Sequence, residues 1–367
     1  MKEQTQQSAT KEEEVEEKIE AVQRDVEATK SAQDEWKTYS SKVHLAGYGA
    51  VGYTNDDPKN DRFSQVAFNP IFHYSFNDVI LLESELELEI EGDGETELAL
   101  EYMTIDWLVN DYMTILAGKF LSPLGNFRAN LHPAWVNKLP SAPSGFGHDQ
   151  AAPVADVGLQ LRGGVPIPIR LRYPAYANYK VFVSNGPELE LNEAGDEIEA
   201  VESAGVVSNE DENFLFGGRL GLLPIPSLEI GGSAAYGDLA LEDEADRNYT
   251  VWGFDGHWIW KNLDVRGEYI KQDVDSLPSS VAPDEQKWEA WYAQAAYKLF
   301  STKFEFVTRY SNYNSSHADV EQEQWALGLN YLILPNAMVK FAYEFNNGFE
   351  NEPTNDDRLF IQFAYGF

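Results

Sequence analysis

Residues 79–91 read Val-Ile-Leu-Leu-Glu-Ser-Glu-Leu-Glu-Leu-Glu-Ile-Glu, and this stretch decides the fold. Every odd position from 83 to 91 is a glutamate, whereas the even positions are apolar apart from Ser84. Side chains alternate between the two faces of a β-strand, so the stretch predicts a strand with one apolar and one fully charged face. A helix would spread the same glutamates around its circumference and leave no apolar stripe.

The composition of the 367-residue chain narrows the class of protein. A net charge of −34 excludes nucleic acid as a partner, because phosphates require a basic surface. The absence of cysteine excludes disulfides and thiolate catalysis. There is no run of about 18 apolar residues, which excludes a transmembrane helix. Residues 1–41 lack the apolar core of a signal peptide, as in a cytoplasmic protein or a mature exported chain.

The amino-terminal segment 11–37 is charged, favours helix and carries a heptad repeat. A repeat of this length predicts a short α-helical coiled coil, and β-branched seam residues favour a trimer. A lone, frayed helix is the alternative. The seam residues are Val15, Ile19, Val22, Val26, Thr29, Gln33 and Trp36.

The remainder of the chain repeats the alternation seen in residues 79–91. In 63–76 the apolar positions oppose Gln65, Asn69, His73 and Ser75, and the chain ends on alternating aromatic and aliphatic residues. In 95–108 the face of Leu98, Leu100 and Tyr102 is expected to oppose Glu97 and Glu101. Sixteen strands are predicted, at 42–54, 63–76, 79–91, 95–108, 111–121, 155–163, 174–184, 213–222, 227–238, 248–261, 263–273, 287–299, 301–312, 322–334, 337–347 and 358–367.

The connections between these strands alternate between very short turns and mostly longer polar loops. An up-and-down meander with unequal ends gives this order, and a membrane barrel requires one apolar and one polar face on nearly every strand. A soluble sandwich would need an apolar core between its sheets instead. We therefore predict an all-β fold, a 16-stranded antiparallel transmembrane β-barrel at 42–367 preceded by the coiled-coil segment 1–41.

Several short motifs carry a family resemblance over 42–367. Gly118-Lys119-Phe120-Leu121-Ser122-Pro123-Leu124-Gly125 is similar to the motif before the third loop of the phosphate-selective porin O/P-like and DcaP-like porins. The alternation ending in Phe367 resembles the barrel-assembly signal of Gram-negative outer-membrane porins, and DcaP-like porins also carry an amino-terminal coiled coil. The resemblance implies a trimeric porin with residues 1–41 in the periplasm. Phosphate selectivity is not implied, since the chain lacks the family's ladder of basic residues.

The charged residues predicted to face the lumen divide by sign along the chain. Acids on one wall and bases on the other would create a transverse field, whereas simple solvation of a wet wall is the alternative. The acids are Glu83, Glu85, Glu87, Glu89, Glu97 and Glu101. The bases are Lys119, Arg162, Lys180, Arg219, Arg266, Lys298, Lys303, Arg309 and Lys340.

Two loops are candidates for a specific role. The segment 122–154, with Arg128, His132 and Lys138, is predicted to fold into the bore and constrict it, as third loops commonly do in trimeric porins; an external flap is the alternative. The segment 185–212 is strongly acidic, so it forms either a site for bridging divalent cations or, as we favour, a solvated flap. Gly47, Gly49 and Gly52 would allow close approach at a subunit interface.

Neither catalysis nor a cofactor or metal site is predicted. The six histidines show no ligand spacing, and none has an evident serine partner. The sequence therefore predicts a passive outer-membrane channel for small hydrophilic solutes and ions, with the lipid bilayer and two further copies of the chain as partners. A scaffold or adhesin barrel is the alternative, followed by an outer-membrane lipid hydrolase.

Overall fold

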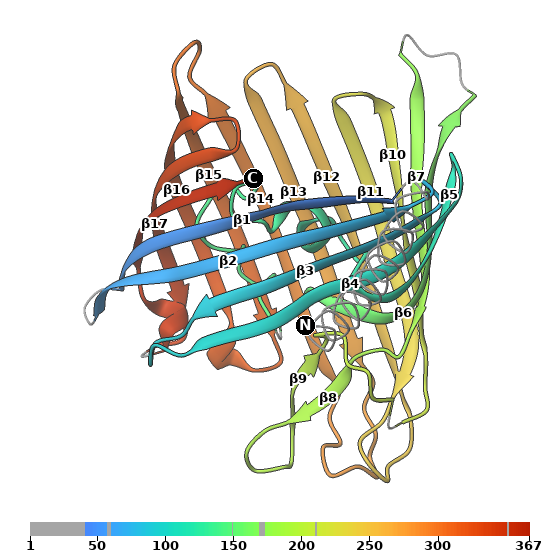
Figure 1. Ribbon diagram of the computed structural model, residues 1–367. Helices are drawn as coiled ribbons and strands as arrows, with labels where there is room; N and C mark the ends of the chain where they lie inside the picture. Colours follow the sequence, from blue (N-terminus) through green and yellow to red (C-terminus); the bar gives the residue numbers. More distant parts are fainter. Residues whose placement is uncertain (1–40, 57–59, 149, 169–172, 210, 351) are drawn as a thin grey trace, which may run out of the picture.

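The computed structural model describes residues 41–56, 60–148, 150–168, 173–209, 211–350 and 352–367 (Figure 1). The predicted coiled coil lies outside these residues, as do its seam positions Val15, Ile19, Val22, Val26 and Trp36. In the described part of the chain, no helix is long and apolar enough to span a membrane.

Sixteen antiparallel strands close into one barrel, in which β1 pairs with β18 (Figure 1). All sixteen predicted strands are confirmed, with ends that differ by a few residues. The barrel strands are β1 (Ser41–Asp56), β2 (Asn60–Phe76), β3 (Ile80–Ile90), β4 (Thr96–Asn110), β5 (Met113–Leu121), β6 (Ala155–Ile167), β7 (Ala175–Ser184), β10 (Leu215–Ile225), β11 (Leu228–Leu239), β12 (Arg247–Trp260), β13 (Leu263–Val274), β14 (Gln286–Lys298), β15 (Phe304–Ser315), β16 (Gln322–Leu334), β17 (Ala337–Gly348) and β18 (Arg358–Gly366).

Two further strands, β8 (Glu188–Leu191) and β9 (Ile198–Glu202), form a separate hairpin in the segment 185–212. The sequence predicted only an irregular loop there. In Figure 1 the hairpin lies at the bottom of the view, at the end of the barrel where the long loops are found. We call this end the long-loop end and the opposite one the short-turn end.

The strands present an apolar face outward and a polar face inward. In β18, Ile361, Phe363 and Tyr365 are exposed, whereas Gln362 between them is buried. Outward residues contact lipid in a membrane barrel, while inward polar residues are hydrated or hydrogen-bonded within the lumen. The period-two pattern therefore has its predicted structural meaning.

The carboxyl terminus completes the closure of the barrel. Phe367 and Gly47 exchange both backbone hydrogen bonds, and the Phe367 ring stacks on Phe68 at a centroid distance of 6.0 Å. A Cβ atom on Gly47 would lie 2.8 Å from the Phe367 ring and 2.5 Å from the Asn69 carbonyl oxygen. Gly47 therefore fits the chain's own terminus rather than a neighbouring subunit, which corrects the prediction for this residue.

Gly52 also departs from the predicted subunit interface. It is buried, and a Cβ atom there would lie 3.2 Å from the Oε1 atom of the lumen residue Gln65. Of the three glycines, only Gly49 lies on the outer face without such a lumen contact or terminal cover.

The side-chain alternation of β4 reverses partway along the strand. Between β3 and β4 the register shifts at Glu85 and Leu86, so that Glu85 pairs with Tyr102 while Leu86 pairs with Leu100. The Tyr102 side chain consequently points inward, toward Glu83. The prediction that Tyr102 shares a face with Leu100 is wrong, because a bulge inserts one residue and reverses the alternation.

The segment 122–154 between β5 and β6, called the inner loop below, lies inside the barrel. It includes the short π-helix η1 (Phe127–Leu131). Its apolar side chains pack against inward residues of β12–β15 in one buried cluster that contains Phe127, Phe146, Tyr249 and Tyr292. The external-flap alternative is therefore wrong.

Candidate functional site: the narrowed lumen

The acidic wall of the lumen is built by β3 and β4. Glu83, Glu85, Glu87 and Glu89 project inward from β3, and Glu97 of β4 pairs with Glu89. Neighbouring strands lie about 4.8 Å apart, so these carboxylates share one surface and give it a negative potential.

Glu85 differs from the other carboxylates of this wall. Only 2% of its surface is exposed, and it accepts a hydrogen bond of 2.8 Å from the Tyr48 hydroxyl. The sequence did not reveal that Tyr48 bonds to this wall, because Glu85 lies two strands away from it in the barrel.

The inner loop faces this acidic wall across a narrow cavity of about 210 Å³. The wall contributes carboxylates, and the loop contributes an arginine and two histidines. The acidic, basic and histidine lining residues are Glu87, Glu89, Glu101, Arg128, His132 and His148. The structure thus brings the predicted loop residues Arg128 and His132 together with three of the predicted acids.

The His132 side chain lines the cavity without adding charge to it. Its Nδ1 atom lies 2.5 Å from the Arg128 carbonyl oxygen. Burial, followed by the nearby Arg128 charge, lowers the pKa of His132 to about 4, so the imidazole is uncharged at neutral pH. Arg128 therefore supplies the permanent positive charge opposite Glu101, with which it interacts electrostatically.

Arg309 and Lys340 do not line the open lumen, contrary to the prediction. Both are fully buried beneath the inner loop. Arg309 donates to the Ser141 carbonyl at 2.9 Å and the Ala142 carbonyl at 3.0 Å, and Lys340 donates to the Ala134 carbonyl at 2.5 Å. A buried irregular segment needs donors for its carbonyl groups, and these two cations provide them.

The predicted loop cation Lys138 also serves as an anchor. Its ammonium group lies 3.0 Å from Glu305 of β15, and its backbone carbonyl accepts a bond from Asn330. At the other end of the loop, Glu268 of β13 accepts the Phe127 N–H at 2.9 Å. Gly125 is required there, since its φ is +93° and a Cβ atom would overlap the Glu268 carboxylate.

Three of the predicted bases form a row across adjacent strands. Arg162 of β6 pairs in register with Lys180 of β7, which pairs with Arg219 of β10. The two arginines are neutralised locally, Arg162 by Asp106 at 2.5 Å and Arg219 by Asp255 at 2.5 Å. Sequence alternation placed each residue inward, but it could not reveal that the register aligns them.

The remaining predicted bases lie at separate places. Lys119 faces Glu101 from the neighbouring strand, and Arg266 pairs with Asp264 at 2.9 Å. Lys298 is exposed near the short-turn end. Lys303 precedes β15 in a turn and donates to the Ile333 carbonyl at 2.9 Å, which corrects its predicted strand position.

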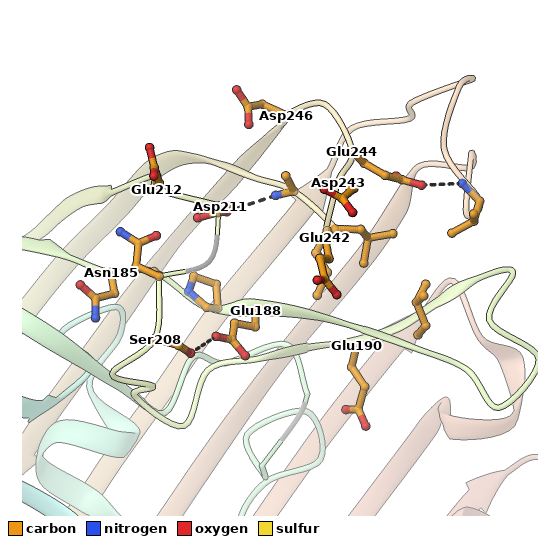
Figure 2. A pocket seen from close by; sticks show the side chains of 18 residues that line it. Asn185, Glu188, Glu190, Ser208, Asp211, Glu212, Glu242, Asp243, Glu244 and Asp246 are labelled. Atoms are coloured by element: carbon orange, nitrogen blue, oxygen red, sulfur yellow. Dashed lines mark hydrogen bonds between the residues drawn. The ribbon is translucent and has the colours of Figure 1, made fainter.

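A second cavity, of about 740 Å³, opens among the long loops (Figure 2). Figure 2 shows its carboxylates spread around the rim, with Asp246 and Glu212 pointing away from Glu190. Among the described residues, no group of three or more side chains is placed to hold a metal ion. The acidic residues that line this second cavity are Glu188, Glu190, Asp211, Glu212, Glu242, Asp243, Glu244 and Asp246.

A closed sixteen-stranded barrel with an apolar exterior, a polar lumen and an inserted loop has the architecture of a porin. Residues 234–367 match the family model of the phosphate-selective porins O and P. No curated protein sequence matches the chain. The family match and the fold support an outer-membrane channel for passive diffusion that resembles this group.

Solved structures show the same fold at low sequence identity. The outer membrane channel DcaP of Acinetobacter baumannii is 10% identical, with a TM-score of 0.62 and coverage of 89% of this chain and 97% of that one. Salmonella typhi OmpF is 12% identical, with a TM-score of 0.59 and coverage of 89% and 98%. An anion-selective porin from Comamonas acidovorans is 12% identical, with a TM-score of 0.58 and coverage of 89% and 100%.

Proposed function

We propose that the protein is an outer-membrane porin through which small hydrophilic solutes and ions diffuse along the acidic wall of β3 and β4. The observation that carries this proposal is the cavity between the inner loop and Glu87, Glu89 and Glu101, inside a closed barrel. The passage needs no cofactor, because diffusion through it breaks no covalent bond.

The constriction prefers cations in this proposal. Five of the nine bases expected on the opposite wall are unavailable to ions: Arg309 and Lys340 are buried under the loop, and Arg162, Arg219 and Arg266 are paired with acids. Arg128 opposes the carboxylates at the cavity, so a local transverse field remains there. Carboxylates that line a pore raise the local concentration of cations.

We also propose a homotrimer, with residues 1–41 as a coiled coil on the periplasmic side. The heptad seam supports this assembly, as does the shared fold with OmpT, an outer membrane protein of Vibrio cholerae described in a trimer form. Gly49 retains the role suggested from the sequence, since it lies on the outer face of β1. Removing residues 1–40 should weaken the trimer, and native mass spectrometry that shows an unchanged oligomer would contradict the coiled-coil role.

Planar-bilayer recording tests the channel function. The full chain, folded in detergent, should give stepwise conductance, and a salt gradient should give a reversal potential of the sign expected for cations. A protein that inserts as a folded barrel and gives no conductance steps would overturn the proposal. An anionic reversal potential would overturn only the selectivity.

A further inference from the structure

Two histidines meet on the lumen side near the short-turn end. His44 of β1 pairs in register with His73 of β2. Their Nδ1 atoms are 3.2 Å apart, and the two rings meet edge to edge, with a centroid distance of 5.5 Å and an interplanar angle of 17°. Neither residue belongs to the constriction described above.

The distance between the two nitrogens suits a shared metal ion. Two imidazole nitrogens bound to one tetrahedral Zn²⁺ at about 2.0–2.1 Å lie about 3.3 Å apart. One imidazole N–H donates to the lone pair of the other ring, which keeps the two nitrogens close to the separation that a shared metal requires. Imidazole ligands favour Zn²⁺, Cu²⁺ and Ni²⁺ over Mg²⁺ and Ca²⁺.

Glu83 of β3 stands behind His73. These residues pair in register, and the Glu83 Oε2 atom lies 3.5 Å from the His73 Nε2 atom. A carboxylate at the second nitrogen of a histidine fixes its tautomer and orientation for metal binding through the first. His73 thus has one nitrogen aimed at His44 and the other beside a carboxylate, as in a carboxylate–histidine–metal arrangement.

The acidic wall leads to this pair of histidines. Glu87 and Glu89 lie beyond Glu83 along β3 toward the long-loop end, so cations that enter there meet carboxylates before they reach the histidines. A two-histidine site leaves the other coordination positions to water, since no larger ligand cluster occurs among the described residues. A site with only two protein ligands releases its metal readily, as expected for a channel and not for a structural metal site.

We propose that His44 and His73, positioned by Glu83, bind a divalent transition-metal cation of the Zn²⁺ class at the short-turn mouth of the lumen. The effect of the metal on ion flow rests on the proposed channel function, but metal binding itself does not. The two properties can therefore be measured separately on the full chain.

Copper titration followed by electron paramagnetic resonance tests the site in detergent. The metal-free protein should bind Cu²⁺ with hyperfine coupling to two imidazole nitrogens. His44→Ala and His73→Ala should each remove that signal, while Glu83→Gln should weaken Zn²⁺ affinity about tenfold in calorimetry. His257→Ala is the matched control, because His257 lies on the lumen side of β12 beside Asp264 rather than another histidine. Identical spectra for the full chain and His44→Ala would overturn the proposal.

Bilayer recording separates the site from the channel function. Zn²⁺ on the short-turn side should reduce the conductance of the unsubstituted channel at least threefold more than that of His44→Ala, whereas Mg²⁺ should not distinguish them. Two-nitrogen copper binding in a barrel that conducts nothing would support the site and refute the channel function. Conductance without two-nitrogen binding would refute the site alone.

Discussion

Replacing Arg309 with methionine should release part of the inner loop without unfolding the barrel. The guanidinium group donates to the Ser141 carbonyl, the Ser141 hydroxyl and the Ala142 carbonyl at 2.9, 2.9 and 3.0 Å. Methionine fills similar space but donates no hydrogen bond, so these acceptors lose their partner. Glu344 keeps an ion pair with Arg358 at 3.0 Å and is not left as an isolated charge.

The size of the effect follows from these contacts. Hydrogen bonds to charged groups contribute about 1.5–3 kcal/mol each and are not additive, so loss of the set costs about 3 kcal/mol. That change raises the ratio of detached to docked loop about 100-fold. Lys340 and the apolar cluster around Phe127 and Phe146 still hold the loop in most molecules.

A single reporter cysteine measures this ratio, because the chain contains no other cysteine. Ala342 is 3% exposed and belongs to the same buried cluster as Leu139 of the inner loop. In an Ala342→Cys background, a water-soluble thiol reagent should react in proportion to the detached population. Arg309→Met should accelerate labelling about 100-fold, as expected from the 3 kcal/mol change.

The matched control is Lys298→Met in the same cysteine background, because Lys298 is exposed at the end of the neighbouring strand β14. Its labelling rate should equal that of the parent. Heat-modified mobility on gels should show that both variants form the barrel. A labelling rate for Arg309→Met within threefold of the parent, in a folded barrel, would refute the anchoring role.

Three further predictions concern the acidic wall, the terminal closure and pH. Changing Glu87 and Glu89 to glutamine should lower the cation-to-anion permeability ratio severalfold in a salt gradient, while Glu352→Gln in a distant loop should leave it unchanged. Gly47→Ala should slow barrel assembly and lower the unfolding temperature, because the new Cβ atom would collide with Asn69 and Phe367. Gly92→Ala is the control, since a Cβ atom there has no neighbour within 4 Å. Equal unfolding temperatures for the two variants would contradict this prediction. The pKa of His132 is lowered to about 4 in the docked loop, so the docked loop loses stability as the pH falls through the ordinary histidine range. The labelling rate of Ala342→Cys, divided by the rate for unfolded protein, should therefore rise about tenfold from pH 7 to pH 5. His132→Gln should abolish this rise.

The strands could be predicted because the lipid and the lumen impose a period of two on local sequence. Glu83 to Glu89 illustrate this, since their inward direction depends only on their alternation with apolar residues. Tyr102 could not be placed, because the bulge that turns it inward arises from pairing between β3 and β4. Its effect on the alternation is visible only once the register is known.

The site was harder to predict because its parts meet across long sequence separations. Arg309 contacts Ser141 across 168 positions, and Lys340 contacts Ala134 across 206. Alternation correctly directed both cations inward, but burial depends on where the inner loop rests. The pairing of His44 with His73 was hidden in the same way, since ligand spacing along one strand cannot reveal neighbours on two strands.

The docking of the inner loop also bears on the order in which the chain folds. Its two ends are joined early, because β5 and β6 pair directly with each other. Its supports, Glu268, Arg309 and Lys340, belong to β13, β15 and β17, so the docked form requires contacts of high sequence separation that form slowly. Until those strands are in place, Phe127 and Phe146 have no complete partner cluster, and an arrested intermediate would expose them to chaperones and proteases.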